Sequence, residues 1–162
     1  MVPSGIDREM LFLQFERLEE HLSRLREVQT ELERQTGRES LLVPAAERLL
    51  QVSIEDCLNI GNHLIAGLPL KRADTYREVF IRLKEAGILP AETGRAMEEF
   101  ASFRSRLVHL YWEVTPDELF TKLGELHYLK RFAEEVVSFL RQRGLMGESR
   151  PSAGSGVQEG DS

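Results

Sequence analysis

One short segment of the chain carries several side chains that could act on a phosphodiester. Within nine positions, residues 104–112 hold two arginines, a serine, a histidine, a tyrosine and the only tryptophan. Histidine titrates near neutral pH, so its imidazole can take a proton from a hydroxyl or return one to a leaving oxygen. A guanidinium can stabilise the extra negative charge on a phosphorus under attack. The segment therefore fits metal-free cleavage of RNA through Arg104 and His109, although composition alone favours an ordinary polar helix face.

Helical geometry places these side chains on different faces. At about 100° per residue, Ser105 and His109 share one face. Arg104 and Tyr111 share another, and Arg104 lies about 140° from His109. A straight helix in one chain would not bring the guanidinium and the imidazole together. Because one histidine cannot easily be base and acid in the same step, a two-fold dimer with two copies of the pair would complete the site.

Nearly the whole chain has helical periodicity, which predicts the elements that must position these residues. Apolar residues recur at helical spacing over residues 7–34, 43–66, 73–86, 91–114 and 116–143. Thr115, Pro116 and Glu118 have the sequence of a capping box before the last helix. Gly87 and Gly144 are expected to end the third and fifth helices.

These elements predict one all-α domain, an antiparallel bundle of about five helices over residues 1–143. Leu110 and Val114 are expected to continue the buried stripe of the fourth helix. Residues 144–162 are rich in Gly, Ser, Pro and Glu. They are expected to form a disordered tail because they cannot bury enough apolar surface to fold.

Composition narrows the class of protein further. The chain has 162 residues and a formal net charge of −6, which argues against coating nucleic acid through bulk positive charge but not against a local basic cleft. A single cysteine, Cys57, excludes an internal disulfide and fits a reducing cytoplasm. Structural-zinc spacings, nucleotide-binding loops, a signal peptide and a membrane span are all missing from the sequence. We therefore expect a cytoplasmic protein without metal or cofactor.

The other three histidines are expected to have structural roles. His21 lies among charged residues and is expected on a solvated flank of the first helix. His63 lies near the end of the second helix, where an imidazolium would interact favourably with the helix dipole. His127 is expected at the edge of the core.

The segment from Arg104 to Tyr111 resembles the R-x-x-x-x-H-x-Y signature of HepT-like proteins, the HEPN-domain toxins of HepT/MntA toxin–antitoxin pairs. The resemblance extends over residues 7–143, including the run 47–62 and the stretches 76–78 and 88–90. It implies an all-helical HEPN fold that forms a homodimer with a composite cleft between the protomers. It also implies a metal-independent endoribonuclease in which Arg104 and His109 carry the reaction, with RNA, for instance tRNA, as the substrate.

The resemblance also implies a partner and a regulatory residue. The chain would be the toxin of a type VII toxin–antitoxin system, neutralised when an MntA-like nucleotidyltransferase antitoxin transfers AMP to Tyr111. Ser105 stands where the family commonly has asparagine, and its hydroxyl offers one donor in place of two. Ser105 could still orient His109, and Arg106 could contact the substrate phosphate or pair with a surface carboxylate.

A second interpretation comes from another class of protein. The chain could be a non-catalytic helical dimer that binds a nucleotidyltransferase partner or a nucleotide and keeps the motif as a docking surface. The acidic balance favours this alternative, whereas the intact set of Arg104, His109 and Tyr111 favours the nuclease. Either dimer could pair further through its outer faces into a larger assembly.

Overall fold

The computed structural model of the chain describes residues 5–34 and 41–145. Within these residues the regular elements are all helical, which confirms the predicted all-α fold. They follow in the order α1 (Arg8–Arg34), α2 (Leu42–Gly67), α3 (Tyr76–Glu85), α4 (Ala91–His109), the 3-10 turn η1 (Tyr111–Glu113), α5 (Pro116–Leu123) and α6 (His127–Gln142). The tail expected beyond Gly144 lies, apart from Leu145, outside the described residues.

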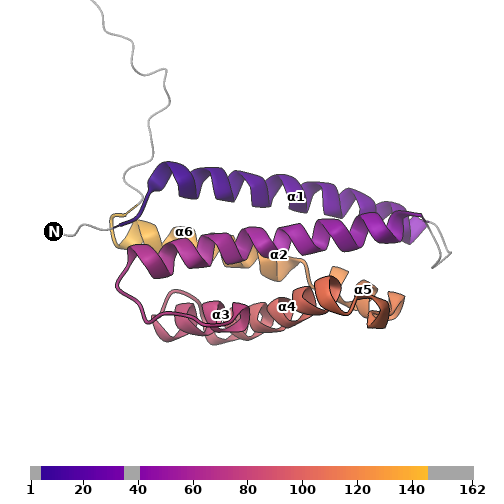
Figure 1. The fold of residues 1–162 in the computed structure, drawn as a ribbon. Helices are drawn as coiled ribbons and strands as arrows, with labels where there is room; N and C mark the ends of the chain where they lie inside the picture. Colours follow the sequence, from indigo (N-terminus) through magenta and orange to yellow (C-terminus); the bar gives the residue numbers. More distant parts are fainter. Residues whose placement is uncertain (1–4, 35–40, 146–162) are drawn as a thin grey trace, which may run out of the picture.

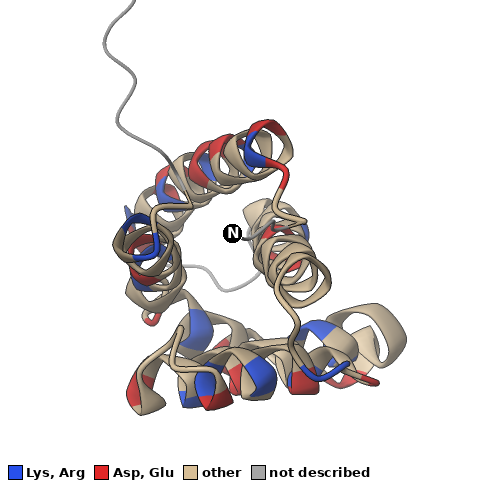
Figure 2. Cartoon of the chain, turned by 90° about the vertical axis from the view of Figure 1, so that its left-hand side faces the viewer, with Lys and Arg blue, Asp and Glu red and all other residues tan. Residues whose placement is uncertain are grey.

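The bundle is organised around α2. Figure 1 shows α1 and α2 side by side along most of their length, with α6 next to α2 and the α3–α4 pair below them. Helix α2 contacts every other α-helix, so residues on α2 can reach several elements. The end view in Figure 2 shows the helices around a shared centre, with basic and acidic residues intermixed on them. None of the described helices combines the length and apolar character needed to cross a bilayer.

Apolar stripes fill the centre of the bundle, as the periodicity predicts. All the residues expected to face inward between positions 119 and 140 are buried. Phe80 of α3 and Phe132 of α6 meet edge to face, with ring centroids 5.6 Å apart. Such aromatic contacts add to the stabilisation from buried area. Phe15 belongs to the apolar stripe predicted over residues 7–34, but it is only partly buried, at the margin of the core.

The fourth helix ends at His109 rather than near residue 114, so the prediction for this boundary was wrong. Thr115 caps α5 in an extended conformation (φ −87°, ψ 157°), and the helical conformation is disfavoured before Pro116. Val114 is extended as well (φ −81°, ψ 119°), so the chain must leave α4 earlier. Leu110 and Val114 consequently fall outside the stripe of α4, and Leu110 is 38% exposed.

The last predicted helix is divided into α5 and α6 by a tight turn over residues 124–126. The N–H of Gly124 donates to the carbonyls of both Phe120 and Thr121, which tightens the end of α5. Glycine has the lowest helix propensity after proline, and this accounts for the break. Leu123 and Leu126 are buried on either side of the turn, so the apolar stripe that predicted one helix continues across it.

Glycines with left-handed backbone end two helices, as expected. Gly87 (φ 78°) follows α3 and Gly144 (φ 68°) follows α6. After each glycine, the next N–H returns to a carbonyl of the last helical turn: Ile88 to Leu83 and Leu145 to Leu140. A residue with a Cβ would be strained at both glycines.

The other histidines contradict their predicted roles. His21 faces α2, where its Nδ1 lies 2.6 Å from Oδ2 of Asp56, a carboxyl whose pKa is raised by burial. His63 Nε2 accepts the N–H of Asp7 at 2.9 Å, so it supports the start of α1 instead of the end of its own helix. His127 is exposed and stacks on Tyr128, with ring centroids 4.3 Å apart. Contacts between segments distant in the sequence, which spacing does not reveal, decide the first two.

Gly61 allows α2 to approach α3 closely, and Gly61→Ala is expected to destabilise the protein. A Cβ at this position would lie 2.6 Å from Cγ1 of Val79 and 3.3 Å from Cδ1 of Leu83. Although alanine gains about 1 kcal/mol of helix propensity over glycine, we expect overpacking to cost about 1–3 kcal/mol net. Urea unfolding followed by circular dichroism would measure the loss.

Gly124→Ala is the matched control, because its Cβ would lie 3.4 Å from the carbonyl oxygen of Thr121, an ordinary contact, and its φ is −72°. Adding Val79→Ala to Gly61→Ala should cost less than the sum of the two single losses. Equal stability of the Gly61→Ala and wild-type proteins would contradict the close contact.

Candidate active site

Arg104 does not project freely from α4 but is held against α2. Its Nε and Nη2 donate to Oε2 of Glu55 at 3.0 and 2.7 Å. Its guanidinium also lies over the ring of Tyr76, at the start of α3, 4.7 Å from the ring centroid. The side chain of Arg104 is only 14% exposed. Three helices therefore meet at this guanidinium.

Glu55 is itself fixed by its neighbours. Gln51, one turn earlier on α2, donates to the same oxygen at 2.9 Å. Burial acts to raise the pKa of Glu55, but hydrogen bonds from Gln51 and Arg104 and the charges of Arg104 and Arg48 lower it below its ordinary value. The carboxylate therefore stays charged opposite Arg104 until the pH falls through that lowered pKa.

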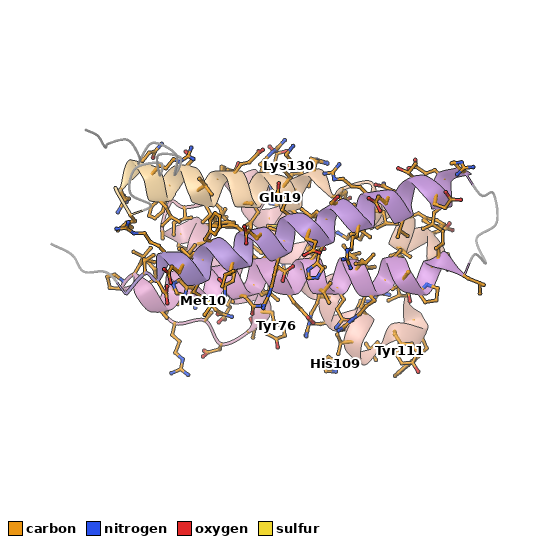
Figure 3. The ribbon with its side chains drawn as sticks, turned by 90° about the horizontal axis from the view of Figure 1, so that it is seen from above. Met10, Glu19, Tyr76, His109, Tyr111 and Lys130 are labelled. Carbon is orange, nitrogen blue, oxygen red and sulfur yellow. The ribbon has the colours of Figure 1, made fainter. Side chains whose placement is uncertain are left out.

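His109 is the last residue of α4 and is exposed. The N–H of Leu110 closes the helix on the carbonyl of Arg106 at 2.8 Å, and the chain then turns away. Ser105 lies one turn before His109 and is partly exposed. No hydrogen bond joins Arg104 to His109 within the described chain, as their angular separation predicts. Figure 3 shows His109, Tyr76 and Tyr111 along one long edge of the molecule, away from Glu19 and Lys130.

Tyr111 is not on the helical face of Arg104, because α4 ends before it. The predicted shared face required a continuous helix, whereas Leu110 has φ −135° and ψ 41° and Tyr111 begins η1. Tyr111 is 64% exposed and Trp112 is 67% exposed. Their rings meet edge to face with centroids 5.4 Å apart. The turn after His109 therefore presents two accessible aromatic side chains.

Arg106 fastens this turn to α5. Its Nη1 and Nη2 donate to the two carboxylate oxygens of Glu118, each at 3.0 Å, and Nη2 also approaches the carbonyl of Glu113 at 3.3 Å. Glu118 completes the predicted capping box by accepting the Thr115 N–H at 3.0 Å, while its own N–H donates to the Thr115 hydroxyl at 3.1 Å. Hydrogen bonds from Arg106 and Thr115 lower the pKa of Glu118. Arg106 was expected either to contact the substrate phosphate or to pair with a surface carboxylate. In the structure it pairs with the carboxylate of Glu118.

Sequence reasoning missed the two partners of Arg104. Glu55 lies 49 residues before Arg104 in the sequence, and no local spacing connects them. The available signal was an acidic pair, Glu55 and Asp56, within a largely apolar helix. Tyr76 falls in a stretch that contributes to the family resemblance, but the sequence assigns it no role.

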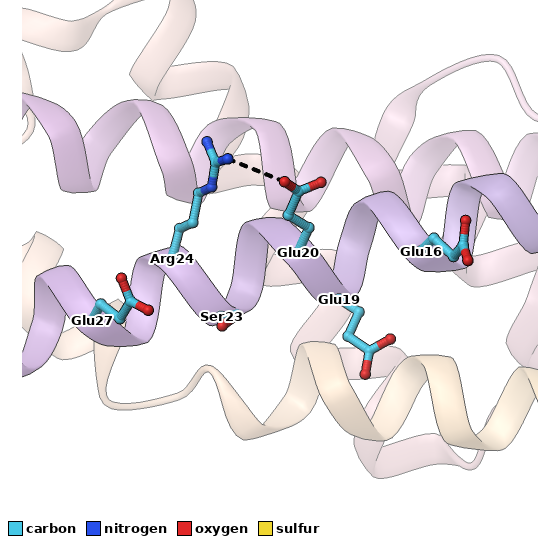
Figure 4. Close-up of a pocket in the computed structure, with 6 residues that line it drawn as sticks. All are labelled: Glu16, Glu19, Glu20, Ser23, Arg24 and Glu27. Carbon is cyan, nitrogen blue, oxygen red and sulfur yellow. Dashed lines mark hydrogen bonds and ion pairs between the residues drawn. The ribbon is translucent and has the colours of Figure 1, made fainter.

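A shallow depression elsewhere on the surface contains none of these residues. Figure 4 shows its lining on the outer side of α1: Glu16, Glu19, Glu20, Ser23, Arg24 and Glu27. Because one helix supplies the whole lining, the depression cannot enclose a ligand. Arg24 and Glu20 within it form an exposed ion pair, with Nη2 3.1 Å from Oε2. In the described residues, no group of three or more His, Cys, Asp or Glu is arranged to hold a metal ion.

Comparisons with known proteins indicate a family and support the fold. A family model described as ribonuclease HepT-like matches residues 18–136, a range that includes the whole segment 104–112. The tRNA nuclease HepT of Aphanizomenon flos-aquae (strain 2012/KM1/D3) is 28% identical over 95 residues, which cover 58% of this chain and 65% of that protein. The match thus spans less than two thirds of the relative. The solved structure of YutE, a cytosolic protein of unknown function from Bacillus subtilis, has a TM-score of 0.74 at 22% identity and covers 91% of this chain and 99% of its own, which supports the fold.

The capping box should govern the order of the turn that carries Tyr111. Thr115→Ala removes the side chain that accepts the Glu118 N–H, and we expect a loss of about 1 kcal/mol in the free energy of unfolding. Hydrogen exchange at Glu113 and Val114, whose amides bond within the turn, should become faster.

Thr121→Ala, the same substitution at an exposed position of α5, is the control. It should leave both quantities nearly unchanged. Similar effects of the two substitutions would contradict the role assigned to the cap.

Proposed function

The chain belongs to the ribonuclease HepT-like family, as the resemblance of its motif predicted, and from this membership we propose that it is a metal-independent endoribonuclease acting through Arg104 and His109. The observation that carries the proposal is the exposed position of His109 at the end of α4, within the matched region. A buried imidazole could not reach a polynucleotide. We further propose that the substrate is tRNA, because the matched relative from Aphanizomenon flos-aquae is named a tRNA nuclease.

The chemistry requires only the side chains in question. A histidine takes the proton of a ribose 2′-OH, the 2′-oxygen attacks the adjacent phosphorus, and the bond to the 5′-oxygen breaks. The leaving oxygen gains a proton from a second acid, giving a 2′,3′-cyclic phosphate and a 5′-OH. Arg104 neutralises the additional charge on the phosphoryl oxygens in the transition state.

A homodimer would supply the second histidine. Two chains related by a two-fold axis place two copies of Arg104 and His109 around one groove, so that one imidazole acts as base and the other as acid. The exposed edge with Tyr76, His109 and Tyr111 is where such a groove would form. Ser105, next to Arg104 and one turn before His109, would help orient the imidazole.

Control of this activity is proposed to act through Tyr111. In a type VII toxin–antitoxin pair, a nucleotidyltransferase partner would transfer AMP from ATP to the phenol oxygen of Tyr111, with release of pyrophosphate and the phenol proton. Tyr111 is 64% exposed, which gives an enzyme access to its hydroxyl. The added phosphate would repel the RNA backbone close to His109.

One observation favours the alternative, a non-catalytic dimer that binds a nucleotidyltransferase or a nucleotide. Both arginines of the segment 104–112 are already paired with carboxylates, Arg104 with Glu55 and Arg106 with Glu118. Ser105 also replaces the more common asparagine. The alternative predicts partner binding without RNA cleavage.

The nuclease proposal predicts that the purified chain cleaves tRNA in the presence of EDTA. His109→Ala and Arg104→Ala should each lower the rate at least about 100-fold, since a general base or a charge-stabilising group contributes this much or more. Gel analysis of labelled tRNA would measure the rates. Expression of the wild type and the same variants in cells would show whether growth arrest requires Arg104 and His109.

Lys130→Ala is the matched control, because Lys130 is an exposed basic residue on the opposite side in Figure 3. It should cleave like the wild type. Cleavage that survives His109→Ala, or that stops with EDTA, would contradict the mechanism. A stable partner complex without any cleavage would support the alternative.

The regulatory proposal predicts a mass increase of about 329 Da per AMP when the chain is incubated with a minimal nucleotidyltransferase partner and ATP. Tyr111→Phe should abolish the increase and escape neutralisation. Tyr128→Phe, which removes a hydroxyl bonded to Glu92, should still accept AMP. Modification at another residue would overturn the assignment.

A further inference from the structure

The guanidinium of Arg104 is held by only one of its edges. Both hydrogen bonds to Glu55 come from the Nε–Nη2 edge and end on the same oxygen, Oε2. A guanidinium has five N–H groups, and these bonds use two of them. Nη1 makes no hydrogen bond within the described part of the chain. Three N–H groups therefore remain, and two of them, one on Nη1 and one on Nη2, form the terminal edge of the guanidinium.

The group is restrained in a second direction by Tyr76, because Cζ of Arg104 lies over the tyrosine ring, 4.7 Å from its centroid. Thr75 caps α3 by accepting the N–H of Glu78, at 3.1 Å, which fixes the turn that carries Tyr76. A planar group bound along one edge and packed on an aromatic ring has little freedom to rotate. Its terminal edge then has a defined direction, and such an edge matches two oxygens of a phosphate.

We propose that Glu55 is a positioning residue for the proposed cleavage, holding Arg104 so that its terminal edge meets the non-bridging oxygens of the scissile phosphate. The inference rests on the proposed function. Gln51 supports it because its amide donates to the same carboxylate oxygen and so fixes Glu55 in turn. The lowered pKa of Glu55 keeps the anchor charged at neutral pH.

The opposite role, inhibition of Arg104 by Glu55, fits the contact less well. A carboxylate that fully blocked phosphate binding would also occupy the terminal edge, which can pair with a phosphate in two parallel hydrogen bonds. The side-on contact leaves that edge available. Cleavage and the Glu55 contact can therefore coexist without the ion pair breaking.

The two roles predict opposite effects of removing Glu55. Glu55→Ala should lower kcat for tRNA cleavage by about 10–100-fold with a smaller change in KM, since a displaced charge-stabilising group costs this much. Glu55→Gln keeps an oxygen that can accept from Arg104, so it should recover most of the loss. Wild-type or higher kcat in Glu55→Ala would overturn the proposal, and higher kcat would indicate inhibition.

Glu92→Gln is the control for removal of an acidic residue. Glu92 lies 12 positions before Arg104 on α4, about 18 Å along the axis at 1.5 Å per residue, and pairs with Arg131 instead. It should leave kcat unchanged. Circular dichroism of each variant shows whether a lower kcat comes from unfolding or from displacement of Arg104 in a folded chain. If Glu55→Ala unfolds, the folded Glu55→Gln variant still tests the proposal.

A readout without RNA separates this inference from the proposed function. In the NMR spectrum of the wild-type chain, the Nε–H signal of Arg104, assigned by its loss in Arg104→Lys, should exchange slowly with solvent and barely shift when dimethyl phosphate is added. In the folded Glu55→Gln or Glu55→Ala chain it should exchange faster. A fast-exchanging wild-type signal would refute the anchor even if RNA is cleaved. Slow exchange of the Arg104 Nε–H in a chain that cleaves no RNA would support the restraint of Arg104 by Glu55 and would contradict the nuclease proposal.

Discussion

The arrangement of the candidate site depends on the ion pair between Arg104 and Glu55. An arginine that is only 14% exposed needs a partner, because an unpaired charge away from water is strongly unfavourable. Glu55 is supplied by α2, the helix that contacts every other α-helix of the bundle. The close approach at Gly61 brings α3 against the same helix, and α3 carries Tyr76. The position of one guanidinium is therefore set by the packing of three helices and not by its neighbours in the sequence.

A second constraint is the cap of α5, which forces α4 to end at His109. Val114 and Thr115 have extended backbone before Pro116, and Arg106 ties the intervening turn to Glu118. This early end has two consequences. The imidazole of His109 comes to lie at an exposed helix terminus, and Tyr111 moves onto a separate turn with its hydroxyl accessible. Residues that a continuous helix would have distributed around its faces are instead presented together at one edge of the molecule.

Local features of this chain were predictable from its sequence, and contacts between helices were not. The stripes around Leu119, Leu129 and Phe132, the capping box and the glycine ends all follow from periodicity and backbone preference, which act within a few residues. The family was visible from the spacing of Arg104, His109 and Tyr111. The bond from Arg104 to Glu55 and the pair of His21 with Asp56 depend on which helix lies alongside, so spacing could not reveal them. The prediction of one continuous helix failed in α4. The apolar stripe continues past residue 110, but the helix ends at His109 because the chain is extended at the cap residue Thr115, five positions after residue 110.

Charge pairing also limits how such a chain could recognise RNA. Its formal net charge is −6, and both arginines of the segment 104–112 are paired with carboxylates at hydrogen-bonding distance. Long-range attraction of a polyanion by a single chain is therefore weak, because it depends on a local excess of positive charge. In the proposed nuclease, recognition would then rely on donors that are correctly directed at short range and on the second copy of the site in the proposed dimer. A guanidinium whose direction is fixed before the substrate arrives suits this requirement better than a mobile one, since the entropy of ordering it is already lost on folding.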